Sequence, residues 1–136
     1  MKKSFILSKI IILSTIVCFA FAFTTQDPLT ESIKRGKAVY DTNCASCHMA
    51  GGEGIEGVFP PLAKSDYLMA NKKRSIQQIL YGVKGKIVVK GVTYEGEMPA
   101  SGLTNKETAD VLNYIRNSWG NKGAIVTEAE VKSERK

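Results

Sequence analysis

Five consecutive residues of this 136-residue chain have the types and spacing to hold a redox cofactor, the run Cys44-Ala45-Ser46-Cys47-His48. The pattern C-x-x-C-H is the attachment sequence of a covalently bound c-type haem. Residues three and four apart share one face of a helical turn, so two thiols and an imidazole can address one flat ligand. The sequence therefore predicts thioether bonds from Cys44 and Cys47 and a proximal iron ligand from His48.

His48 is the only histidine of the chain. This excludes bis-histidine ligation of the iron and any Ser-His or Cys-His catalytic pair that does not use His48 itself. Three other interpretations of the motif fit less well. A redox dithiol of thioredoxin type expects a βαβ surrounding that the sequence does not show. A disulfide between Cys44 and Cys47 would be strained, and a zinc knuckle needs four ligands where only three residues cluster.

Residues 1–22 have the features of a secretory signal peptide. Lys2 and Lys3 precede an apolar run, and Ala20-Phe21-Ala22 is a small-x-small cleavage pattern. The alternative is an uncleaved N-terminal membrane anchor, which would have to tolerate Lys9. Export agrees with haem attachment, because thioether bonds on a two-cysteine motif form on the oxidising side of the membrane. We therefore expect a periplasmic protein, soluble or anchored through its N-terminus.

Removal of residues 1–22 leaves 114 of the 136 residues, enough for one small domain. The formal charge falls from +6 to +3, because three of the 19 basic residues leave and 13 acidic residues stay. The basic composition is therefore no argument for nucleic-acid binding. We expect a short leader at 23–29, one domain at 30–120, and a C-terminal extension with a short helix at 121–136.

Helices are predicted on both sides of the motif. Thr30 is the expected cap of a helix that contains Gly36 and runs into the motif. A loop rich in glycine and proline follows at 49–66, then short helices at 66–70 and 75–80, the second ended by Gly82. A capping box at 104–107 begins the last long helix, expected to run to Gly120, and another at 127–130 begins the C-terminal helix.

A β-hairpin is predicted between these helices, with strands at 86–89 and 92–94 around the two-residue turn Lys90-Gly91. Met98 follows in what we expect to be an irregular segment, where a thioether can be aimed at the iron. Met49 adjoins His48 and cannot reach the other face of the iron, and Met69 lies in a helical stretch where packing is its expected use. Met98 is therefore the predicted sixth ligand. His/Met ligation raises the reduction potential and fills both axial positions, which is typical of electron transfer.

The sequence resembles the class I (His/Met) monohaem cytochromes c over most of residues 30–120. It is similar to the cytochrome domains of copper nitrite reductases and to the cytochrome subunits of membrane-bound dehydrogenases. The runs that carry the resemblance are Val58-Phe59-Pro60-Pro61-Leu62, Gly96-Glu97-Met98-Pro99-Ala100 and Val111-Leu112-Asn113-Tyr114-Ile115-Arg116-Asn117-Ser118-Trp119-Gly120.

The resemblance implies an all-α fold, with the first and last long helices crossed at nearly right angles around one haem c. It implies that Gly36 and Tyr40 meet Val111 and Tyr114 at that crossing. It also implies that the backbone carbonyl of Pro60, or of Pro61 if the register differs by one residue, accepts a hydrogen bond from the His48 ring. The residues then expected to line the haem pocket are Phe59, Leu62, Leu103 and Leu112. The hairpin is expected to form a lid on the methionine side.

The function expected from these features is that of an exported, monomeric electron carrier, not an enzyme, whose partners are an oxidase, a reductase or a dehydrogenase. The alternatives are a haem sensor or a peroxidase-like enzyme with a labile sixth ligand, and a thiol–disulfide oxidoreductase. Two basic clusters, at 72–74 and at Lys84, Lys86 and Lys90, either form a docking face for an acidic partner or are simply solvated.

Overall fold

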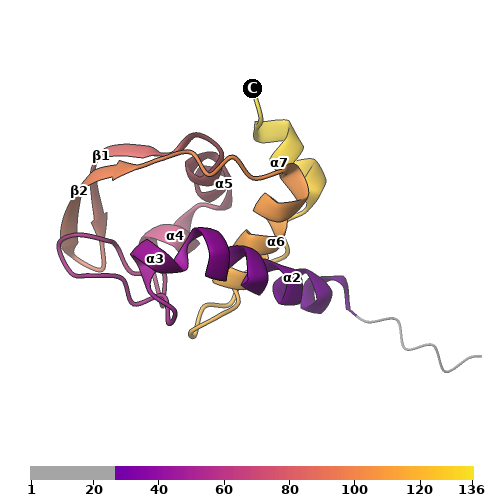
Figure 1. Ribbon diagram of the computed structural model, residues 1–136, viewed down its shortest axis with the longest axis horizontal. Coiled ribbons are helices and arrows are strands. Elements are labelled where there is room, and N and C mark those ends of the chain that lie inside the picture. The colour runs from indigo at the N-terminus through magenta and orange to yellow at the C-terminus, as the bar shows by residue number, and fades with distance from the viewer. Residues whose placement is uncertain (1–26) are drawn as a thin grey trace, which may run out of the picture.

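The computed structural model describes residues 27–136, so the predictions for the signal peptide or anchor and for leader residues 23–26 lie outside the described residues. This part of the chain is mostly helical, with one antiparallel pair of strands (Figure 1). None of its helices is long and apolar enough to cross a lipid bilayer. The elements are α2 (Pro28–Asn43), α3 (Ala45–His48), α4 (Asp66–Ala70), α5 (Lys72–Tyr81), β1 (Val83–Val89), β2 (Val92–Met98), α6 (Asn105–Ile115) and α7 (Glu128–Glu134).

Helix α2 begins earlier than predicted. Its N-cap is Asp27, whose carboxylate accepts a hydrogen bond from the Thr30 backbone N–H at 3.2 Å, and Pro28 is its first residue. The expectation that Thr30 caps the helix was wrong, because an aspartate followed by proline is a strong helix start that we placed in the leader. The leader prediction at 23–29 is correspondingly too long, since Pro28 and Leu29 are helical.

Helices α2 and α6 pack against each other at Gly36. A Cβ atom at Gly36 would lie 1.9 Å from the Asp110 carbonyl oxygen and 2.9 Å from the Tyr114 Cβ. The rings of Tyr40 and Tyr114 are in contact, with centroids 5.4 Å apart. Gly36 therefore lets the two backbones approach closely, as we expected from a glycine in a helix. The nearly perpendicular crossing stays a prediction.

Asp110 forms a polar network across the α2–α6 contact. Its side chain is 7% exposed and accepts hydrogen bonds from the Ser32 hydroxyl at 2.6 Å, from Arg35 at 2.7 and 2.8 Å and from Lys106 at 2.8 Å. Burial alone would raise the pKa of Asp110, but the hydrogen bonds from Arg35, Lys106 and Ser32 hold it below its usual value. The network links α2 to α6 through charge-assisted hydrogen bonds.

The capping boxes of α6 and α7 are both confirmed, with Thr104 and Thr127 as the N-caps. Helix α6, however, ends at Ile115 and does not run to Gly120. Trp119 adopts a positive φ of 52° and packs outside the helix, so its helical spacing was misleading. The C-terminal extension is well packed, because the side chains of Val126 and Val131 are 1% and 0% exposed.

The hairpin is longer than predicted but has the predicted turn. Strand register runs from Val83 opposite Met98 to Val89 opposite Val92, and Lys90 and Gly91 both have positive φ, at 51° and 79°. The hairpin lies on the left in Figure 1, away from α7. Met98 is the last residue of β2, so the predicted irregular segment at 97–102 begins only at Pro99, and the expectation was wrong for Met98 itself. The strand extends this far because the register that the turn sets continues without interruption until Met98 pairs with Val83.

Candidate haem site

Cys44 lies at the junction of two helices. It is the C-cap of α2 and the N-cap of α3, with its backbone N–H bonded to the Tyr40 carbonyl at 2.9 Å and its own carbonyl bonded to the His48 N–H at 2.9 Å. Its side chain is half-buried against the core, whereas Cys47 is exposed. Neither thiol forms a disulfide. The predicted motif therefore forms one tight turn with both thiols free.

The electrostatics of Cys44 disfavour a redox dithiol. Burial, and to a smaller extent the neighbouring Cys47, raises the pKa of Cys44 to about 11. A reactive cysteine needs the opposite shift, because the thiolate is the nucleophile. Among residues 27–136 no group of three histidine, cysteine or acidic side chains could hold a metal ion, so the zinc-knuckle alternative also lacks support.

The imidazole of His48 is held by the backbone. Its Nδ1 lies 2.9 Å from the Pro60 carbonyl oxygen. A carbonyl can only accept, so Nδ1 carries the proton and the lone pair is on Nε2, the arrangement typical of a metal-ligating histidine. Burial lowers the pKa of His48, which favours the neutral ring. The acceptor of this hydrogen bond is Pro60 and not Pro61.

The loop after His48 is folded so that it presents this carbonyl. The His48 carbonyl accepts the Gly54 N–H at 3.0 Å, and a Cβ at Gly54 would lie 2.9 Å from the Pro60 oxygen. The Tyr40 hydroxyl donates to the Met49 carbonyl at 2.7 Å. Trp119 packs on the start of the loop, where a Cβ at Gly52 would meet its ring at 2.5 Å. Sequence reasoning missed these supporting contacts, although the density of glycines was a signal for them.

Met98 lies on the face of the hairpin that also carries two glycines. Gly85 and Gly96 are directly opposite each other in the register, and an added Cβ at either one would meet no heavy atom within 4 Å. Alternate residues of a strand share a face, so Met98, two pairs further along β2, lies on the same face as Gly96. The two glycines therefore leave this face of the hairpin without side chains next to the methionine, so a flat group such as haem would meet no steric barrier there.

The second candidate methionine and the predicted pocket residues are all at least half-buried. Met69 is half-buried in α4 and packs against the core, as does Met98. Phe59, Leu62 and Leu103 are half-buried, whereas Leu112 is fully buried in the core. Burial of these four side chains agrees with a pocket wall and equally with ordinary core packing, so their role in lining a pocket stays a prediction.

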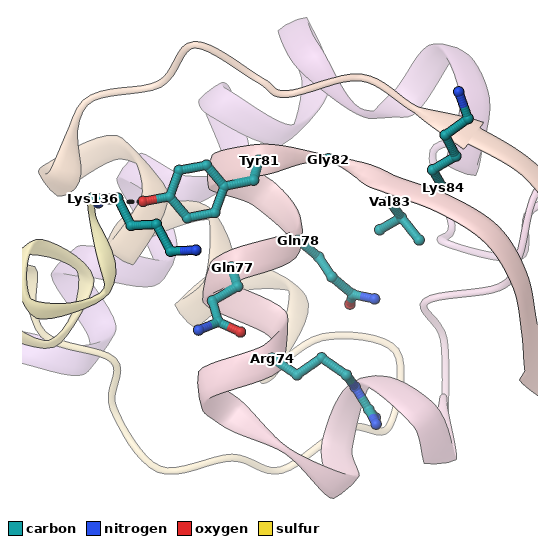
Figure 2. Close-up of a pocket in the computed structure, with 8 residues that line it drawn as sticks. All are labelled: Arg74, Gln77, Gln78, Tyr81, Gly82, Val83, Lys84 and Lys136. Carbon is teal, nitrogen blue, oxygen red and sulfur yellow. Dashed lines mark hydrogen bonds between the residues drawn. The ribbon is translucent and has the colours of Figure 1, made fainter.

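A separate shallow cavity of about 360 Å³ lies where α5 passes into β1 (Figure 2). Three cationic side chains border it, those of Arg74, Lys84 and Lys136. Arg74 and Lys84 point to opposite sides of it (Figure 2), and Arg74 stacks on the Tyr67 ring with its guanidinium carbon 3.8 Å from the ring centroid. The charges therefore do not converge on one ligand position.

A C-x-x-C-H turn whose histidine is fixed by a backbone carbonyl, within a small helical domain, defines a c-type cytochrome. The comparison with known families agrees, since residues 33–119 match the cytochrome c family. The chain belongs to this family, which implies covalently bound haem c.

Three relatives illustrate the range of this similarity. The chain is 39% identical over 124 residues to cytochrome c-552 of Thermus thermophilus, covering 84% of this chain and 83% of that protein. It is 38% identical over 102 residues to the cbb3-type cytochrome c oxidase subunit FixP of a Bradyrhizobium species, covering 70% of this chain and 34% of that protein. It is 33% identical over 90 residues to the cytochrome c subunit of a quinone alcohol dehydrogenase from Gluconobacter oxydans, covering 63% of this chain and 18% of that protein. The predicted resemblance to cytochrome c and to dehydrogenase cytochrome subunits is confirmed, and that to nitrite reductase domains stays a prediction.

Proposed function

We propose that the protein is an exported electron carrier that passes single electrons between redox proteins. Cys44 and Cys47 would hold the haem through thioether bonds, and His48 and Met98 would ligate its iron. The haem iron supplies the one-electron change between the ferric and ferrous states. The chain holds the His48 ring in one orientation through Pro60 and offers a thioether from the hairpin. With both His48 and Met98 bound to the iron, no position on it would be open to a substrate.

The observation that carries the proposal is the composition of the hairpin face on which Met98 lies. No side chain on this face is a carboxylate, imidazole, amine or amide, the groups that could transfer a proton to or from a bound substrate. Its only hydroxyl is that of Tyr94, a residue 5% exposed. The face consists of Val83, Gly85, Ile87, Val89, Val92, Tyr94, Gly96 and Met98. A peroxidase-like enzyme needs a general acid or base near the open iron position, so this face favours a carrier.

The proposed location and organisation rest on the sequence. Residues 1–22 are proposed to direct export and then to be cleaved, or to anchor the protein in the membrane. The cytochrome domain at 30–120 and the extension at 121–136 form one monomeric unit in this proposal. The contacts of Val126 and Val131 with the core support a single unit.

The proposed partners are an oxidase, a reductase or a dehydrogenase. The names of the relatives support redox proteins in general, because they include an oxidase subunit and a dehydrogenase subunit. Docking through the first basic cluster has less support than the sequence suggested. Lys72 forms an ion pair with Glu130, and Lys73 lies 3.1 Å from Glu134, so α7 carboxylates neutralise both.

Two of the three hairpin lysines, Lys84 and Lys86, lie opposite acidic residues of β2. Lys84 is opposite Glu97, with their charged atoms 3.8 Å apart, and Lys86 is opposite Glu95 in the register. Lys90 is at the turn, where its backbone N–H donates to the Asp66 carboxylate at 2.9 Å, so an acidic side chain lies near this lysine as well. We therefore propose that partner recognition depends little on these lysines.

The long-wavelength absorption band from methionine to ferric iron tests the ligand proposal. The wild-type protein should show this band, Met98→Ala should lose it, and Met69→Ala should keep it. Met69 is the matched control, because it is the other half-buried methionine packed against the core. A band that persists in Met98→Ala and disappears in Met69→Ala would assign the sixth ligand to Met69.

A further inference from the structure

The backbone around Met98 is attached to the end of helix α5. Met98 pairs with Val83, the first residue of β1, and Gly82 joins that residue to α5. Figure 2 shows the chain passing from Tyr81 through Gly82 into the strand. The C-terminal end of α5 is thus joined directly to the strand pair that carries the proposed ligand.

Gly82 permits this attachment by its small size. A Cβ at Gly82 would lie 2.3 Å from the Met98 carbonyl oxygen and 3.0 Å from the Ala100 backbone nitrogen. Gly82 also has φ 80° and ψ −176°, a region that is essentially restricted to glycine. Any other residue at this position would have to displace the backbone of Met98 or change the course of the chain between α5 and β1.

Ser101 attaches the other side of the ligand segment to the same helix. Its backbone N–H and its hydroxyl both donate to the Ile79 carbonyl, at 3.1 and 2.9 Å. Ile79 itself is buried, at 9% exposed, and belongs to the core. The backbone of Met98 is therefore restrained twice. Met98 itself pairs with Val83, next to the end of α5, and Ser101, three residues later, binds Ile79 within α5.

We propose that Gly82 and Ser101 are positioning residues that keep Met98 on the iron and exclude external ligands. The inference rests on the proposed function, in which Met98 is the sixth ligand. A side chain that starts from a restrained backbone loses little conformational freedom on binding, so it competes well against a free ligand. In this proposal the contacts with the end of α5 favour the methionine over external small molecules as the sixth ligand, which is what an electron carrier requires.

Imidazole titration of the ferric holoprotein tests this role. Gly82→Ala should raise the affinity for imidazole at least tenfold and weaken the methionine-to-iron band. Gly91→Ala is the matched control, because Gly91 has φ 79° but an added Cβ there meets no atom within 4 Å. It should change the affinity by less than twofold. Equal effects of the two substitutions, or no effect of Gly82→Ala, would overturn the proposal.

Ser101→Ala provides a second and milder test. It removes the hydroxyl but keeps the backbone hydrogen bond to Ile79, so the fold should persist and the imidazole affinity should rise at least threefold. Ser133→Ala is its control, since the Ser133 hydroxyl donates to the Glu130 carbonyl at 2.7 Å at an exposed position. If Gly82→Ala does not fold, the comparison of Ser101→Ala with Ser133→Ala tests the proposal by itself. An unchanged imidazole affinity in Ser101→Ala would then overturn it.

Met98→Ala in the same titration separates the two proposals. If Met98 is the ligand, this variant binds imidazole more tightly than any other. A Met98→Ala protein with wild-type affinity and an intact band would refute the ligand assignment itself. Loss of the band in Met98→Ala, together with wild-type behaviour of folded Gly82→Ala and Ser101→Ala, would refute only the positioning role.

Discussion

Replacement of Asp110 by asparagine should destabilise the protein by about 1.5–3 kcal/mol at neutral pH, the range for hydrogen bonds to a charged group. The Asp110 side chain is 7% exposed and binds Arg35, Lys106 and Ser32. The loss should not reach the larger values of a fully buried ion pair, because the side chains of Arg35 and Lys106 are 47% and 54% exposed and water can solvate them. Asparagine also keeps one oxygen that can accept from Ser32 or Arg35.

The loss should depend on pH in a defined direction. The pKa of Asp110 is lowered in the folded protein, so its contribution is fully present above the pKa of an unfolded aspartate, about 3.9, and disappears as the pH falls through the folded-state value. Urea unfolding of holoprotein at pH 7 and near pH 3, with the wild type and the variant side by side, measures this difference. The gap between them should shrink at the lower pH.

A matched control is Asp41→Asn, which removes the exposed ion pair between Lys37 and Asp41 within α2. This change should have little effect, because exposed pairs within a helix contribute little. If Asp110→Asn is no more destabilising than Asp41→Asn, or if its effect is the same at both pH values, the account of the α2–α6 network is incorrect.

Other substitutions test the packing and the docking proposal. Gly36→Ala should cost about 1–3 kcal/mol in urea unfolding, because its Cβ would lie 1.9 Å from a carbonyl oxygen of α6; a gain in stability, as expected for a free helical position, would show that the helices can separate. Val131→Ala should cost about 1.6 kcal/mol for two buried methyl groups, whereas Val88→Ala, at a residue 53% exposed, should cost almost nothing; equal losses would contradict the packing of α7. The double variant Lys72→Ala and Lys73→Ala should leave the electron-transfer rate to a partner unchanged in stopped-flow measurements, and a large fall in that rate would restore the docking role of this cluster.

The sequence was most informative where local chemistry decides the structure. Both capping boxes are present because a threonine and a glutamate three residues apart satisfy each other's backbone groups without help from the rest of the protein. The Lys90-Gly91 turn was predictable for the same reason. Gly36 was also interpretable, because an unfavourable residue within a helix indicates a close contact elsewhere.

Predictions failed where distant segments determine the structure. Met98 lies in a strand because the register set by the Lys90-Gly91 turn continues as far as Val83, and local residue preference alone did not show that the strands extend beyond 86–94. Trp119 follows the helical period but leaves the helix, where its ring packs on Tyr40 and Tyr114 with centroids 5.1 and 5.3 Å away. The ion pairs of Lys72 and Lys73 with α7 likewise could not be read from the sequence, which left open whether these lysines dock a partner or are simply solvated.

Exposure of the reduced protein to carbon monoxide tests the central claim most directly. A carrier whose iron is bound on both sides by its own chain should keep the same ferrous spectrum with and without carbon monoxide, while Met98→Ala should bind the gas. Rapid and complete carbon monoxide binding by the wild type would contradict the account, because it would show an open or weakly held sixth position and favour a sensor or a peroxidase-like enzyme.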